Sequence, residues 1–148
     1  MEIKMNALKG LEIARKKILF RPDINSPIDP VTKKIVNDNR LKKNAVTLKY
    51  MLENGAAVAL IAHQGDTQDY QNLIPLMEHA QKLTALTGHP VHYIADVCGP
   101  AAIEAVKKLP AGEAIILGNL RYLGEELSTF SNFVKLSPEE MQSVWHVR

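Results

Sequence analysis

The segment Lys17–Asp29, KILFRPDINSPID, decides how the rest of the chain is interpreted. Its apolar residues Ile18, Leu19 and Phe20 predict a short buried strand, and the polar and turn-forming residues after them predict a loop at the carboxyl end of that strand. In α/β proteins, ligands bind outside the carboxyl ends of the strands. We therefore expect the functional residues to lie at one edge of one sheet.

The composition predicts one ordinary globular domain, residues 1–148, with 46% apolar and 23% charged residues. The net charge is only +2, which argues against nucleic acid and membrane surfaces as partners. The longest apolar run, Ala56–Ala62, is far shorter than the roughly 20 residues that a membrane helix needs. Cys98 is the only cysteine, and we interpret it as an inert core thiol in a cytoplasmic protein.

Apolar strand patterns alternate with amphipathic helix patterns along the sequence. The predicted strands are residues 18–20, 56–62, 91–95 and 114–120, and the predicted helices are about 38–54, 72–87, 100–109 and 137–148. Prolines and Asp or Asn residues in the segment 25–38 exclude regular structure there. This alternation predicts an α/β protein with a Rossmann-like, three-layer α/β/α fold and a mainly parallel sheet.

The last predicted helix is short, although its residues have the pattern of a helix that packs against a core. A capping box begins at Ser137, and Met141, Val144 and Trp145 have the spacing of a stripe that faces a core. The sequence ends at Arg148, and a helix of this length gains little stability alone. We therefore expect a fold that is truncated at its carboxyl terminus.

Several common sites are absent from the sequence. It contains neither a GxxxxGK[ST] loop nor a GxGxxG motif after a strand, and it has no HExxH motif. We interpret His79, His89, His92 and His146 as structural or surface residues. No metal site and no cofactor site are expected within the chain.

The remaining polar residues near the predicted strand ends suit a small anion. His63 and Arg121 follow strands, Asp23 and Asn25 could hold hydroxyl groups, and Arg40 lies near a helix start. A cation in the first helical turn opposes the helix dipole at a cost of roughly 0.3 to 1 kcal/mol, which a bound phosphate or carboxylate would offset. A guanidinium group suits bidentate recognition of such oxyanions.

Arg40 also has a simpler interpretation. It could be a surface arginine that pairs with Asp38, which we expect to cap the first helix, or with Asp29. Local chemistry leaves both interpretations open.

Four motifs, RPDINSPIDP, NDNR, AHQG and GNLRY, occur in this order. Together they resemble the amino-terminal domain of phosphoglycerate kinase, and their residues are most similar to those of the archaeal branch of the family. The resemblance extends from about Lys16 to Arg148. It implies reversible phosphoryl transfer between ATP and 3-phosphoglycerate in glycolysis, with 3-phosphoglycerate bound to this domain.

The resemblance also implies a role for each matching residue. The residues that it assigns to the substrate are Asp23, Ile24, Asn25, Arg40, His63, Gln64, Gly65 and Arg121. Asp23 and Asn25 would hold the hydroxyl and carboxylate end, and His63 and Arg121 the phosphate. Arg40 would be catalytic, because it would stabilise charge on the transferring phosphoryl group. MgATP is expected only with a carboxyl-terminal domain, so the isolated chain is expected to be inactive.

Three residues depart from the family pattern. Asp66 stands where HxGRP has an arginine, Pro22 replaces the valine of RVD, and Gly118 replaces the glutamate of ENLR. A unit charge pair at about 4 Å is worth about 4 kcal/mol at an effective dielectric constant near 20, so Asp66 should weaken substrate binding. Pro22 could alter the loop position, and Gly118 should add flexibility before Arg121.

These departures support two alternatives to a substrate domain. One is a degenerate, non-catalytic homologue that binds anions or regulates. The other is an interaction module that uses the apolar face around Trp145. The partners that the sequence suggests are the small-molecule substrate, a second copy of the chain, and a separate carboxyl-terminal half.

Overall fold

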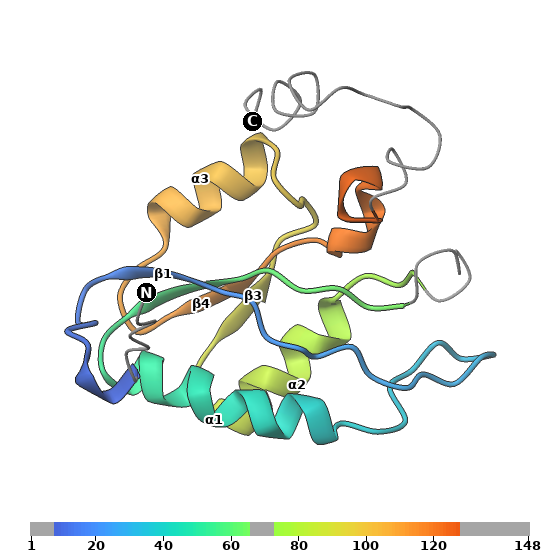
Figure 1. Cartoon of the computed structure of the whole chain (residues 1–148), viewed down its shortest axis with the longest axis horizontal. Coiled ribbons are helices and arrows are strands. Elements are labelled where there is room, and N and C mark those ends of the chain that lie inside the picture. Colours follow the sequence, from blue (N-terminus) through green and yellow to red (C-terminus); the bar gives the residue numbers. More distant parts are fainter. Residues whose placement is uncertain (1–7, 66–72, 128–148) are drawn as a thin grey trace, which may run out of the picture.

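A computed structural model describes residues 8–65 and 73–127 of the chain, and these residues form a four-stranded sheet in the order β1-β2-β4-β3 (Figure 1). All pairs of neighbouring strands are parallel. The strands are β1 (Lys17–Phe20), β2 (Ala57–Leu60), β3 (Val91–Tyr93) and β4 (Ala114–Ile116). The predicted α/β class and parallel sheet are therefore confirmed.

Three α-helices connect the strands in the described part of the chain: α1 (Asn39–Glu53), α2 (Met77–Thr87) and α3 (Pro100–Lys108). Helices α1 and α2 cover one face of the sheet, and α3 covers the other (Figure 1). This arrangement confirms the predicted three layers. The last predicted helix, with its expected stripe and truncation, lies outside the described residues.

The alternation of side chains along the strands divides the core between the two faces. Val58 and Leu60 of β2 pack with the larger cluster beneath α1 and α2, whereas Ala57 and Ala59 pack with the smaller cluster beneath α3. Strand β2 is buried on both faces because it lies between β1 and β4. Strand β1 is at the edge of the sheet, and Leu19 on the α3 side is 67% exposed.

Helix α2 begins at Met77, five residues later than the sequence pattern predicted. Ile74 precedes Pro75, and the residue before a proline is disfavoured in helical conformation. The carbonyl of Ile74 instead accepts a hydrogen bond from Asn119 Nδ2 at 3.0 Å. The segment before α2 is therefore fixed by a side chain from a distant loop.

The loop 25–38 is more ordered than its composition suggested. Ile28 and Ile35 form an isolated antiparallel bridge, and the backbone N–H of Asp29 donates to the Lys34 carbonyl at 2.8 Å. Hydrogen bonds from the backbone and hydroxyl of Thr32 lower the pKa of the Asp29 carboxyl group. The loop thus folds back on itself before α1 begins.

Helix α3 begins above a carboxylate. Asp96 accepts hydrogen bonds from the backbone N–H groups of Ala102 at 3.0 Å and Gly99 at 2.9 Å, and these bonds lower the pKa of Asp96. A Cβ atom on Gly99 would lie 2.8 Å from Asp96 Oδ2, so a side chain there would displace the carboxylate from its present position. Cys98 lies just before this helix start and is exposed, so its prediction as a core thiol is wrong.

Gly118 has a packing role at the end of β4. Its N–H donates to the Asp96 carbonyl at 2.9 Å. A Cβ atom at this position would lie 2.9 Å from Val97 Cγ2 and 3.2 Å from the carbonyl carbon of Asp96. The absence of a side chain therefore lets the β3 and β4 exits approach each other.

Candidate functional site

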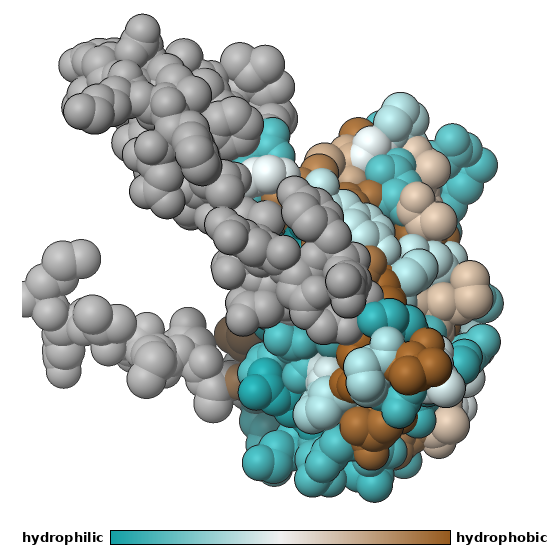
Figure 2. Space-filling model, turned by 90° about the vertical axis from the view of Figure 1, so that its right-hand side faces the viewer, coloured by the Kyte–Doolittle hydropathy of each residue, from teal (hydrophilic) through white to brown (hydrophobic). Residues whose placement is uncertain are grey.

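Three loops meet at the edge of the sheet where the strands end, which we call the carboxyl edge. They follow β1, β2 and β4, and they carry the residues that the sequence assigned to the substrate, except Arg40, which lies in the first turn of α1. Figure 2 faces this edge, and the described surface there is mainly hydrophilic with separate hydrophobic patches. The parallel direction of all strands explains why residues from distant motifs gather here.

Side-chain amides connect the loops beyond the end of the backbone ladder. Gln64 donates through Nε2 to the Ser26 carbonyl at 2.8 Å and accepts through Oε1 from the Ser26 N–H at 2.9 Å. One amide side chain therefore satisfies both backbone groups of Ser26. Gln64 is 2% exposed, and Oε1 also lies 3.1 Å from His79 Nε2.

Asn119 repeats this arrangement one strand further along the sheet. Its Oδ1 accepts from the Gln64 N–H at 3.1 Å, and its Nδ2 donates to the Gln64 carbonyl at 2.9 Å. The same Oδ1 accepts from the Arg121 N–H at 3.1 Å, and the side chain is fully buried. Ser26, Gln64 and Asn119, which we call the amide network, thus join the loops after β1, β2 and β4.

Asn25 and Gly65 form a further link between the first two loops. The Gly65 N–H donates to Asn25 Oδ1 at 3.1 Å, and Asn25 Nδ2 lies 3.5 Å from the Gly65 carbonyl. Gly65 has a φ of +95°, a conformation that glycine adopts without strain. The structure therefore brings these two predicted site residues together.

Asp23 and Arg40 form an ion pair at the start of α1. Arg40 Nη1 lies 2.7 Å from both carboxylate oxygens of Asp23. Asn44 Nδ2 donates to the carbonyls of Asp23 at 2.8 Å and Arg40 at 2.9 Å, which fixes the loop against the helix. The surface-pair interpretation of Arg40 named the wrong partners, Asp38 and Asp29. Asp38 pairs instead with Lys42 at 2.9 Å.

Arg21 and Glu126 form a second ion pair at the same edge. Arg21 Nη2 lies 2.5 Å from Glu126 Oε1, and the side chains are 55% and 19% exposed. Glu126 belongs to the 3-10 helix η4 (Gly124–Leu127). The sequence had not singled out either residue as a ligand contact, because nothing in their local pattern shows that they meet across 105 positions.

Arg121 differs from these two arginines. It lies in the 3-10 helix η3 (Leu120–Tyr122), directly after Asn119. Its Nε and Nη1 atoms are buried and have no hydrogen-bond partner among residues 8–65 and 73–127. A buried guanidinium group without partners is costly, because its hydration is lost without a replacement. An incoming oxyanion would supply the missing acceptors.

His63 lies within the electrostatic field of these charged groups. Burial is the main cause that lowers the pKa of His63, and the positive charges of Arg121 and Arg21 lower it further. The negative charges of Glu126 and Asp23 oppose this shift. At neutral pH the imidazole is therefore neutral and can donate a hydrogen bond without first gaining a proton.

Two of the predicted contact residues have buried side chains. Ile24 is 1% exposed and packs in the larger core cluster, so only its backbone is available at the site. The Gln64 side chain is engaged with Ser26 and His79 and acts as a support for its neighbours. Asp66 lies outside the described residues.

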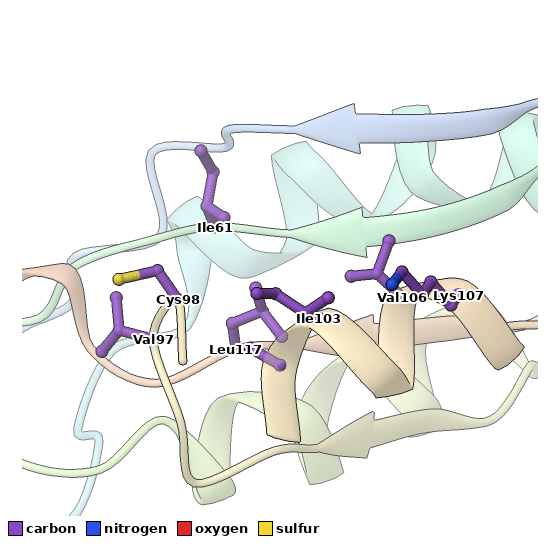
Figure 3. Close-up of a pocket in the computed structure, with 8 residues that line it drawn as sticks. Ile61, Val97, Cys98, Ile103, Val106, Lys107 and Leu117 are labelled. Atoms are coloured by element: carbon purple, nitrogen blue, oxygen red, sulfur yellow. The ribbon is translucent and has the colours of Figure 1, made fainter. Parts of the chain in front are cut away.

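A separate groove of about 400 Å³ lies between α3 and the sheet (Figure 3). Its lining includes Ile61, Val97, Ile103 and Leu117, and Cys98 lies at one end. These side chains are apolar, so the groove does not suit a small, highly charged ligand. The carboxyl edge is therefore the candidate site for a small anion.

Within residues 8–65 and 73–127, no group of three or more His, Cys, Asp or Glu residues is arranged to hold a metal ion. In the same part of the chain, no helix has the length and apolarity to cross a membrane.

The fold and the edge together define a class of protein: a parallel α/β domain with arginine and histidine residues gathered at the strand ends. The family model for phosphoglycerate kinase matches residues 8–143. The chain belongs to the phosphoglycerate kinase family. The resemblance of its motifs to this family is thereby confirmed.

Individual relatives agree with this assignment. Phosphoglycerate kinase from Sulfolobus acidocaldarius is 37% identical over 126 residues, which cover 85% of this chain and 30% of that protein. The Methanothermobacter thermautotrophicus protein is 33% identical over 148 residues, or 34% of its length. The crystal structure of phosphoglycerate kinase from Pyrococcus horikoshii has a TM-score of 0.77 and 36% identity, covering 93% of this chain and 31% of that one. The chain thus spans about a third of the length of these relatives.

Proposed function

We propose that this chain provides the 3-phosphoglycerate site of a phosphoglycerate kinase. The observation that carries the proposal is that Arg121 Nε and Nη1 are buried without a hydrogen-bond partner in the described part of the chain, within electrostatic range of His63. A phosphate group matches these atoms in charge, and its oxygens can accept the hydrogen bonds that both nitrogens are able to donate. The neutral imidazole of His63 adds a further donor.

Asp23, Asn25 and Arg40 are proposed to hold the other end of the substrate. Asn25 is positioned through Gly65, and Asp23 through Asn44. Binding of the substrate hydroxyl to Asp23 would release Arg40 from its present ion pair. Arg40 would then stabilise charge on the transferring phosphoryl group, a role that depends on position and electrostatics.

MgATP is proposed to bind a second domain, as expected from the sequence. Neither common phosphate-binding loop occurs in the 148 residues. Phosphoryl transfer would therefore require that the nucleotide domain meets the carboxyl edge described above.

Calorimetric titration with 3-phosphoglycerate tests the proposal. We expect the chain to bind in the micromolar to low-millimolar range, and Arg121→Ala to lose at least about tenfold in affinity because it removes a charged hydrogen bond to phosphate. Arg15→Ala is the matched control, since Arg15 precedes β1 and lies at the opposite edge of the sheet. Equal binding by Arg121→Ala and the unchanged chain would contradict the proposed site.

A non-catalytic anion-binding module is the second candidate. It is favoured by the two ion pairs, because Arg21 and Arg40 are already engaged with carboxylates of the same chain. An Asp66→Arg variant separates the candidates. Binding of 3-phosphoglycerate only after this substitution would support a degenerate site, whereas binding by both forms would support the substrate domain.

A further inference from the structure

The segment that delivers Arg121 to the carboxyl edge also delivers an acidic residue. Helices η3 and η4 follow one another, so Arg121 and Glu126 are five positions apart. Glu126 reaches back to Arg21, and its side chain is largely buried in doing so. An ion pair with a buried member is screened less by salt than one that is fully exposed.

We propose that Glu126 is a specificity-determining residue that competes with incoming anions for Arg21. An anion that uses Arg21 must first displace the Glu126 carboxylate, which lies 2.5 Å from the guanidinium nitrogen. This inference rests on the proposed anion site at Arg121.

The competition favours ligands with more than one negative group. A small anion that binds only Arg21 gains one contact and loses the existing ion pair, so little free energy is gained. A ligand that also contacts Arg121 gains contacts there without displacing any carboxylate, because Arg121 Nε and Nη1 have no partner in the described part of the chain. Glu126 thus disfavours binding of a simple monoanion relative to binding of a ligand with more than one negative group.

Removal of the Glu126 charge provides the direct test. In calorimetric titrations, we expect Glu126→Gln to bind inorganic phosphate about three- to tenfold more tightly, and to tighten 3-phosphoglycerate binding by a smaller factor, since one competing charge pair is removed. Glu53→Gln is the matched control, because Glu53 ends α1 far from the carboxyl edge and pairs only at 3.8 Å with Lys49. This control should change either affinity less than about twofold.

A double variant shows whether the effect acts through Arg21. In an Arg21→Gln background, Glu126→Gln should no longer tighten binding, because the group for which it competes is absent. A separate measurement needs no ligand: NMR titration of His63 should give a lower pKa in Glu126→Gln, since Glu126 opposes the effects of burial, Arg121 and Arg21.

The outcomes distinguish this inference from the proposed function. Unchanged affinities in Glu126→Gln, together with loss of binding in Arg121→Ala, would overturn the competition and leave the anion site intact. An unchanged His63 titration would also overturn it, because the Glu126 charge would then not act at the edge. No binding by any variant would overturn both proposals.

Discussion

Both carboxylate oxygens of Asp23 lie 2.7 Å from Arg40 Nη1, so the loop after β1 is tied by charge to the first turn of α1. The side chains are 65% and 53% exposed. Exposed ion pairs contribute less than about 1 kcal/mol to stability. The pair therefore matters more for the position of the two groups than for folding.

Arg40→Ala should lower the free energy of unfolding by less than about 1 kcal/mol. The same change should weaken 3-phosphoglycerate binding at least about tenfold, because it removes a charge-assisted contact at the proposed site. Urea denaturation and calorimetry measure the two effects. Lys49→Ala, on an exposed turn of the same helix, is the control for loss of a positive charge. A large loss of stability with unchanged binding would show that Arg40 is structural.

Asn119→Ala should destabilise the fold by about 3 kcal/mol, because four backbone groups would lose their partner in a buried place. These are the N–H and carbonyl of Gln64, the N–H of Arg121 and the carbonyl of Ile74. Urea denaturation measures the change. Asn54→Ala removes one exposed bond to the Tyr50 carbonyl and should cost under about 1 kcal/mol. Equal effects of the two substitutions would argue against the amide network.

His79 should make the fold less stable in acid. Burial lowers the pKa of His79 from 6.5 to about 4, against a smaller opposing effect of the Ile24 backbone. Above pH 6.5 the residue is neutral in both states. As pH falls towards 4, the unfolded chain gains a proton that the folded chain does not, so the free energy of unfolding drops by about 3 kcal/mol.

Urea denaturation between pH 7 and 4 tests this effect. His79→Gln should remove that part of the pH dependence, whereas His92→Gln, at an exposed position of β3, should leave it unchanged. The same slope in all three proteins would show that other groups cause the loss of stability.

Gly118→Ala should cost about 1 to 3 kcal/mol, because the new methyl group meets Val97 and the Asp96 backbone at less than normal contact distance. Thermal unfolding measures the change. Gly10→Ala is the control, since no atom lies within 4 Å of the added methyl group there. If Gly118→Ala left the thermal stability unchanged, this would indicate that the β3 and β4 exits separate easily.

The order of strands and helices was predictable because hydrophobic periodicity reports burial. The predicted strands were too long, because buried apolar residues continue beyond the last residue that pairs with a neighbouring strand. Leu117 is 5% exposed and Ala62 is 1% exposed, yet both lie beyond the last paired residue of their strands. A sequence pattern shows which residues are buried, but it does not show where backbone pairing ends.

The candidate site was predictable in its location but not in its contacts. Of the two interpretations left open for Arg40, the surface pair named Asp38 or Asp29 as the acid, whereas the acid in contact is Asp23, 17 positions away. Glu126 was missed for the same reason. Asn119 was missed because an asparagine after a strand is ordinary, and only the folded chain shows that it binds two distant segments, at Gln64 and at Ile74.

The amide network also links the opening of the three loops at the carboxyl edge. The N–H groups of Ser26 and Gln64 donate to side-chain oxygens carried by a neighbouring loop, so the opening of one loop would break the bonds that hold the next. We therefore expect the loops after β1, β2 and β4 to open as one cooperative unit, and the amide protons of Ser26 and Gln64 to show similar protection from exchange with solvent. A ligand that binds any one loop should then restrain all three.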